Sequence, residues 1–153
     1  MRTWPQLVTE KSSLLGFAGF KAGGIHILTV DDREKTPNFG KQLLNPATVI
    51  ATPPMRIIGI RGYKRDLYGQ HAIFDVYAKD LPKELSRKFD AKGTDDGFSK
   101  AESLLNSASV VMAVVAVSPN SIGLAQKVPF VFEVAVSGKD PRSQYDYVKS
   151  LLG

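Results

Sequence analysis

His26 and His71 are the only two histidines in this chain, and a metal site or nucleophilic triad would have to be built around one of them. His26 lies in an apolar strand and His71 opens another strand, and neither has a second histidine or a cysteine at ligand spacing. The adjacent carboxylates Asp31 and Asp32 point to opposite faces of a strand, which favours a loop anchor over acid–base catalysis. A structural or surface role is therefore predicted for each histidine, and the sequence predicts no cofactor, no metal site and no enzymatic activity.

A second group of residues has the chemistry to bind phosphate. The run Arg61-Gly62-Tyr63-Lys64-Arg65 places three cations around one aromatic ring, which suits a nucleic-acid backbone. Arg56 precedes Arg61 at an odd separation, so the two arginines should face opposite sides of a regular strand. A plain solvated basic loop explains these residues about equally well. A weaker group of the same kind lies at the amino end and consists of Arg2, Trp4 and Lys11.

Four glycines surround Lys21, and small residues let a backbone or a ligand approach closely. They match neither the phosphate-binding loop nor the dinucleotide fingerprint, because no helical pattern follows them. Two interpretations stay open: tight backbone packing, or close approach of a phosphate with Lys21 as its partner. The glycines are Gly16, Gly19, Gly23 and Gly24.

The charge of the chain is unevenly distributed. Residues 1–65 hold ten Lys/Arg and four Asp/Glu, a balance of +6, whereas residues 66–153 hold ten and eleven, a balance of −1. A polyanion is therefore expected to meet the first part, with a solvated basic face as the alternative. The absence of cysteine excludes disulfides and thiolate metal sites. The amino end lacks a signal-peptide core and no apolar run is long enough to span a bilayer, so we expect a soluble intracellular protein.

The basic residues must be positioned by β structure. Apolar runs at residues 15–20 and 25–30 flank Ala22-Gly23-Gly24, which predicts a hairpin turn there, followed by a loop at 31–41. Residues 47–52 and 56–63 predict two more strands around Pro53-Pro54, because neither proline can donate to a sheet ladder. The polar stretch 62–70 is the predicted connection, and we place the domain boundary there, giving domains 1–66 and 67–153.

The second part mixes strands and helices. Strands are predicted at 71–78, 109–117 and 130–136, and the nearly unbroken β-branched run at 109–117 indicates a central buried strand. A loop is predicted at 118–128. Helices are predicted at 81–89, across Phe98, Ala101, Leu104 and Leu105, and after an Asp140 cap with Pro141 in the first turn. This order predicts a two-layer α/β sandwich, and an α+β fold for the whole chain.

Two motifs resemble the archaeal and eukaryotic form of the large-subunit ribosomal protein L3 family. They are the glycine, aromatic, Lys-Ala-Gly run at residues 16–23 and Thr52-Pro53-Pro54-Met55-Arg56, in the family's order and approximate spacing. The resemblance covers nearly the whole chain, including residues 2–5, 49–51, 75–78, 81–85, 129–138 and 145–153. It implies a partial β-barrel of the translation-protein type, followed by an inserted α/β subdomain, in a protein that binds large-subunit ribosomal RNA.

The chain departs from the family pattern in two places. Gly24-Ile25 stands where the family usually has Met-Thr, so any contact of that segment is not carried over. The resemblance stops at Gly153, before the remaining barrel strands and the long loop that reaches towards the peptidyl transferase centre. We therefore expect the amino-terminal part of a split or truncated member, whose uncovered strands a second polypeptide completes by β-pairing.

The function expected from the sequence is a structural constituent of the large ribosomal subunit, in the cytoplasm, bound to ribosomal RNA and to neighbouring ribosomal proteins. Cationic side chains should contact phosphates and position the protein without reading base sequence. Two other classes stay open: a protein-interaction module that acts off the ribosome, and a small-molecule enzyme on a β-barrel. The expected RNA contacts are Lys21, Arg56, Arg61, Lys64 and Arg65, supported by Arg2, Trp4 and Lys11.

Overall fold

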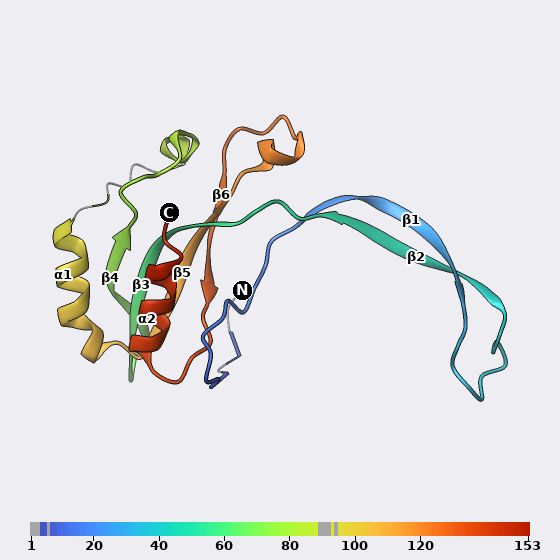
Figure 1. Cartoon of the computed structure of the whole chain (residues 1–153), viewed down its shortest axis with the longest axis horizontal. Helices are drawn as coiled ribbons and strands as arrows, with labels where there is room; N and C mark the ends of the chain where they lie inside the picture. The colour runs from blue at the N-terminus through green and yellow to red at the C-terminus, as the bar shows by residue number, and fades with distance from the viewer. Residues whose placement is uncertain (1–3, 6, 89–92, 94) are drawn as a thin grey trace. The chain divides into compact units, whose positions relative to one another are not determined.

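A computed structural model describes residues 4–5, 7–88, 93 and 95–153 of the chain (Figure 1). They form two compact units, a larger one from Met1–Ala18 and Pro53–Gly153 and a smaller one from Gly19–Thr52. Both contain antiparallel sheet, and the larger unit also contains helices, which confirms the α+β class. In the described part of the chain, no helix has the length and apolar character needed to cross a membrane.

The larger unit is built on a four-stranded antiparallel sheet with the order β4-β3-β5-β6. β5 lies inside this sheet and is mostly buried, as its β-branched run predicts. β6 does not show the wetter face expected from its alternation, because its burial rises along the strand: Phe130 is 45% exposed, whereas Val134 and Ala135 are 0% and 4% exposed. The strands are β3 (Arg56–Asp66), β4 (Gly69–Tyr77), β5 (Val110–Val117) and β6 (Phe130–Ala135).

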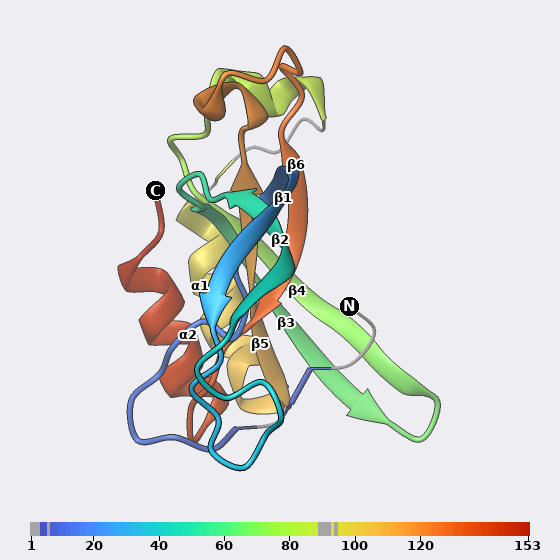
Figure 2. The same ribbon diagram turned by 90° about the vertical axis from the view of Figure 1, so that its right-hand side faces the viewer.

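Helices α1 (Asp95–Leu104) and α2 (Pro141–Ser150) cover one face of the sheet (Figures 1 and 2). Asp140 caps α2 with Pro141 in its first turn, as predicted, and the Asp140 amide donates to Ser143 Oγ at 3.3 Å. α1 continues into the short 3₁₀ helix η2 (Leu105–Ser107). The two helices therefore enclose an apolar layer against the sheet.

This main core is formed by alternate residues of the strands and by the inner faces of the helices. On β5 the residues that face the helices are Val111, Ala113 and Val115. The helical segments contribute Ala101, Leu105, Tyr145 and Val148.

The helical spacing of Phe98, Ala101, Leu104 and Leu105 predicts that Leu104 lies in the core, but its side chain is 40% exposed. The segment turns Ala101 and Leu105 towards the sheet instead, at 0% and 7% exposure. Leu104 therefore lies at the edge of the inner face, and its assignment to the core is wrong.

The opposite face of the sheet carries a smaller apolar cluster of Ile58, Leu85, Val114 and Ala116. Leu85 comes from η1 (Lys83–Arg87), a 3₁₀ helix where the sequence predicts a longer helix over 81–89. Residue 89 lies outside the described residues. Another 3₁₀ helix, η3 (Pro119–Ile122), lies within the predicted loop 118–128.

The smaller unit is a two-stranded hairpin of β1 (Phe20–Val30) and β2 (Gln42–Ala51), joined by the predicted loop at 31–41. The expected turn at residues 22–24 is wrong, because Gly23 and Gly24 pair with Val49 and Thr48 inside one continuous strand. The register of the ladder shifts between Lys21 and Gly23, so the glycine-rich segment forms an irregularity within the strand and not a turn.

The strand expected at 15–20 is also not observed. An isolated bridge forms at Leu14, and β1 begins only at Phe20. The apolar residues of this segment therefore belong mostly to an extended connection that leads into the hairpin.

The observed division of the chain differs from the boundary expected between residues 66 and 67. That position lies at the end of β3, and β3 and β4 pair across the two-residue turn of Leu67 and Tyr68. The polar stretch 62–70 is thus largely strand, because a hairpin that extends past its sheet can be polar on both faces. Pro53 and Pro54 lie between β2 and β3, outside both ladders, as predicted.

Candidate nucleic-acid interface

Arg56 and Arg61 lie on the same face of the sheet. Across the ladder, Arg56 lies opposite Ala116 and Arg61 lies opposite Met112. These two residues of β5 are an even number of positions apart, so their side chains point to the same face of the sheet. The register shifts between Ile57 and Gly59, which inserts one extra residue into β3. The prediction that the two arginines face opposite sides assumed a regular strand, and it is wrong for this reason.

Arg61 is held by two carboxylates from other strands of the sheet. Its Nε donates to Asp75 Oδ1 at 2.5 Å and its Nη2 to Asp75 Oδ2 at 2.8 Å. Its Nη1 also donates to Glu133 Oε1, and the Tyr63 hydroxyl donates to Glu133 Oε2 at 2.7 Å. The Arg61 side chain is 28% exposed, so this cluster is partly removed from water.

The cluster changes the electrostatics of its members. The hydrogen bonds with Asp75 are the main reason why the pKa of Arg61 lies above its ordinary value. Burial is the main reason why the pKa of Tyr63 is raised, and the hydrogen bond to Glu133 raises it further. Because both carboxylates already neutralise the guanidinium, Arg61 has little capacity left for a phosphate, and we assign it a structural role across β4, β3 and β6.

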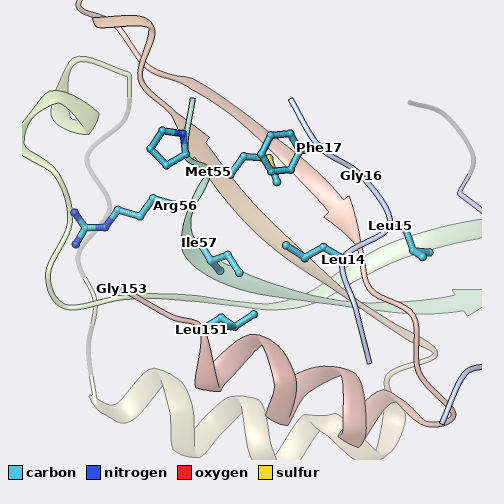
Figure 3. Close-up of a pocket in the computed structure, with 10 residues that line it drawn as sticks. Leu14, Leu15, Gly16, Phe17, Met55, Arg56, Ile57, Leu151 and Gly153 are labelled. Carbon is cyan, nitrogen blue, oxygen red and sulfur yellow. The ribbon is translucent and has the colours of Figure 1, made fainter. Parts of the chain in front are cut away.

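Arg56 lies beside an apolar pocket of about 740 Å³ in the larger unit. Leu14, Phe17 and Leu151 are among its lining residues, while the guanidinium of Arg56 extends away from them (Figure 3). Arg56 Nη2 donates to the Asp80 carbonyl at 3.1 Å and lies 3.7 Å from Asp80 Oδ2. This exposed pair leaves Arg56 available to an anionic partner, because surface ion pairs are weak.

Lys64 and Arg65 are the cations of the expected cluster that stay exposed. The structure pairs neither side chain with a carboxylate among the described residues. The Arg65 amide donates to Ser109 Oγ at 3.1 Å, which ties the strand back to the start of β5. These two side chains therefore present positive charge near the end of β3, which the partly exposed carboxylate of Asp66 offsets in part.

The other expected contacts fall in different places. Lys21 is exposed on the hairpin, next to the register shift of β1, and Lys11 is exposed in the amino-terminal segment of the larger unit. Arg2 lies outside the described residues. The structure therefore brings together Arg61, Lys64 and Arg65 on one strand, and leaves Lys21 in the separate smaller unit.

Trp4 packs against the main core. A Cβ placed on Gly16 would lie 2.7 Å from Trp4 Cη2, so the glycine is needed for the indole to lie against the chain. For Gly16 the packing interpretation is thus the correct one. Gly23 and Gly24 have open space where a side chain would stand, so nothing in the hairpin requires glycine there for packing.

Sequence reasoning missed the turn between β3 and β4. Leu67 is 100% exposed and Tyr68 is 93% exposed, shortly after the cations at positions 64 and 65. Asp66 Oδ1 accepts the Tyr68 amide at 2.8 Å and lies 3.3 Å from His71 Nε2. Gly69, with a φ of +129°, was the signal in the sequence that could have located this turn.

The described residues contain no group of three or more His, Asp or Glu side chains placed to hold a metal ion. His26 lies on β1 of the hairpin, and His71 contacts Asp66. The chemistry available at the basic end of β3 is therefore electrostatic binding of an anion.

The family model for ribosomal protein L3 matches residues 1–151, which is nearly the whole chain. The chain belongs to the ribosomal protein L3 family. Curated relatives named large ribosomal subunit protein uL3 are similar along nearly its full length. The protein from Methanococcoides burtonii is 37% identical over 99% of the chain, and those from Methanoregula boonei and Pyrobaculum aerophilum are 34% and 35% identical over 99% and 100%.

This L3-family chain spans about half the length of the curated relatives it matches, with 47% of each of these three covered. The match confirms the resemblance inferred from the glycine run and the Thr52-Pro53-Pro54-Met55-Arg56 motif. The curated relatives are named as proteins of the large ribosomal subunit.

Proposed function

We propose that this L3-family chain is a structural constituent of the large ribosomal subunit in the cytoplasm, where it binds large-subunit ribosomal RNA and neighbouring ribosomal proteins. The observation that carries the proposal is the family match over residues 1–151, together with relatives named as large-subunit proteins. The exposed cations near the end of β3 supply the chemistry, because Lys and Arg neutralise phosphates without reading sequence.

The proposed RNA contacts follow from exposure and pairing. Lys64 and Arg65 are the principal contacts, since neither side chain has a carboxylate partner among the described residues. Arg61 and Trp4 support RNA binding indirectly, by stabilising the fold. Arg61 does so through its ion pairs with two carboxylates, and Trp4 by packing against the core. The supporting cations are Lys21, Arg56 and Lys11, which are exposed or half-buried, and Arg2, which is proposed from the sequence.

We further propose that residues 1–66 contribute to a barrel of the translation-protein type that a second polypeptide completes. The β1–β2 hairpin supports this because both of its faces expose large apolar side chains. Leu28 and Leu44 face each other on one side at 61% and 66% exposure, and Ile25 and Val49 lie on the other at 48% and 43%. An isolated two-stranded hairpin is marginally stable in water, so added strands would stabilise it.

The binding of the purified chain to large-subunit ribosomal RNA at increasing salt tests the RNA part of the proposal. We expect the logarithm of the binding constant to fall linearly with the logarithm of salt concentration, because each neutralised phosphate releases counterions. A matched variant, Lys64→Gln with Arg65→Gln, should show a shallower slope. Affinity that stays constant from low to moderate salt contradicts phosphate binding.

A second candidate is a protein-interaction module that acts off the ribosome, which the apolar pocket favours. Phe17 lines this pocket and is 67% exposed, so Phe17→Asp removes apolar contact area without disturbing a buried residue. If this candidate is correct, Phe17→Asp abolishes partner binding while Lys64→Glu with Arg65→Glu leaves it intact. The RNA proposal predicts that Lys64→Glu with Arg65→Glu weakens RNA binding, while Phe17→Asp leaves RNA binding intact.

A further inference from the structure

Two large apolar side chains occupy the turn between β3 and β4. Turns of this length usually take Gly, Asn, Asp, Pro or Ser, which favour the turn backbone. Leu67 and Tyr68 are instead 100% and 93% exposed, so their side chains contribute almost nothing to the packing of the chain. In the described structure β3 pairs with β5 only as far as Tyr63, and the hairpin projects from its sheet beyond that point (Figure 2).

The backbone of this turn is held by its own contacts. Asp66 Oδ1 accepts the Tyr68 amide at 2.8 Å and lies 3.3 Å from His71 Nε2, on the opposite strand. Gly69 supplies the backbone conformation that ends the turn, with a φ of +129°. The ring of Tyr68 is thus presented on an ordered backbone, which reduces the ordering cost of a contact made there.

Two exposed cations precede the turn on β3, three and four residues before Tyr68. Lys64 and Arg65 are exposed and have no carboxylate partner among the described residues. The Asp66 carboxylate is 43% exposed and accepts the Tyr68 amide, so it offsets part of their positive charge. An exposed aromatic ring a few residues from unpaired cations matches an unpaired nucleotide, whose base can stack on the ring and whose phosphates can contact the cations. A base inside a duplex has no free face, so the ring would gain nothing from it.

We propose that Tyr68 stacks on an unpaired base of RNA while Lys64 and Arg65, which point to opposite faces of the hairpin, hold phosphates on either side of it. The proposal rests on the RNA-binding function proposed above and adds the class of site, a single-stranded or bulged segment. A protein partner fits the tip less well, because two side chains bury far less than the roughly 800 Å² per partner of a stable interface.

The test uses the full chain and two probes: an oligouridylate carrying one 2-aminopurine, and the same strand annealed to its complement. Binding is measured by fluorescence anisotropy, and stacking by quenching of the 2-aminopurine. Tyr68→Ala is compared with Tyr68→Phe, which keeps the ring, and with Leu67→Ala. Thermal unfolding of each variant should match that of the unsubstituted chain, because these side chains are exposed.

We expect Tyr68→Ala to weaken single-strand binding about tenfold and to remove the quenching, while duplex binding and the salt slope stay the same. Tyr68→Phe should bind as the unsubstituted chain does. Equal single-strand affinity of Tyr68→Ala and the unsubstituted chain overturns the stacking proposal, as does an equal loss on both probes. If salt-dependent binding persists in that case, the proposed function survives; if the unsubstituted chain binds neither probe nor ribosomal RNA, both proposals fail.

Discussion

Replacement of Arg61 by methionine separates a structural arginine from an RNA-binding one. The substitution removes two hydrogen bonds to Asp75 and one to Glu133, and leaves two carboxylates without their cation. Exposed ion pairs contribute about 0–1 kcal/mol, and breaking a buried pair costs about 3–5 kcal/mol. Since the three side chains are 26–37% exposed, we expect Arg61→Met to cost about 2 kcal/mol of unfolding free energy, between these limits.

The assay is urea unfolding followed by circular dichroism, combined with the salt dependence of RNA binding. With a urea m-value of about 2 kcal/mol/M, the expected loss lowers the midpoint by about 1 M. The matched control is Arg65→Met, the same substitution at an exposed position of the same strand. Its unfolding free energy should stay within about 0.5 kcal/mol of that of the unsubstituted chain. The slope of the logarithm of the RNA-binding constant against the logarithm of salt concentration should fall in magnitude by roughly 0.7–0.9.

The reasoning is refuted if the two variants exchange their behaviour. An unchanged midpoint for Arg61→Met, together with a shallower salt slope, would show that its guanidinium contacts phosphate rather than the two carboxylates. A loss of stability in Arg65→Met of the same size would show that exposure does not distinguish the two positions.

Individual contacts give three more expected outcomes. Lys64→Gln with Arg65→Gln should reduce the salt slope of RNA binding by roughly 1.5, and an unchanged slope contradicts their role as phosphate contacts. Gly16→Ala should cost about 1–3 kcal/mol and shift the emission of the single tryptophan, because a Cβ at Gly16 meets the indole; unchanged emission and stability contradict that packing. The side-chain hydrogen bond from Arg33 lowers the pKa of Asp31 below its usual 3.8, so its stabilisation of the 31–41 loop should be complete above that pH and lost as pH falls through the lower, folded-state pKa. An NMR titration of the Asp31 carboxyl that gives an ordinary or raised pKa contradicts this bond.

Patterns with a clear physical cause were predictable from the sequence. The β-branched run of β5 has few alternatives to an inner strand, and Asp140 followed by Pro141 favours the start of a helix. The two prolines at 53 and 54 had to lie outside the ladders, and they do. In each case a local rule and the tertiary structure favour the same outcome.

The features that were not predictable depend on register. The shift between Ile57 and Gly59 places Arg56 and Arg61 on one face, and residue spacing alone cannot reveal an inserted residue. The carboxylates that hold Arg61 come from positions 75 and 133, far away in the sequence. The same limit applies to the hairpin turn expected at Gly23-Gly24, because glycine favours a turn and an irregular strand equally.

Sucrose-gradient sedimentation of a lysate from cells that make this chain tests its place on the ribosome most directly. The account predicts that the chain migrates with large ribosomal subunits at moderate salt, together with a second polypeptide that covers the β1–β2 hairpin, and that high salt releases it. A chain that stays at the top of the gradient at every salt concentration contradicts the account.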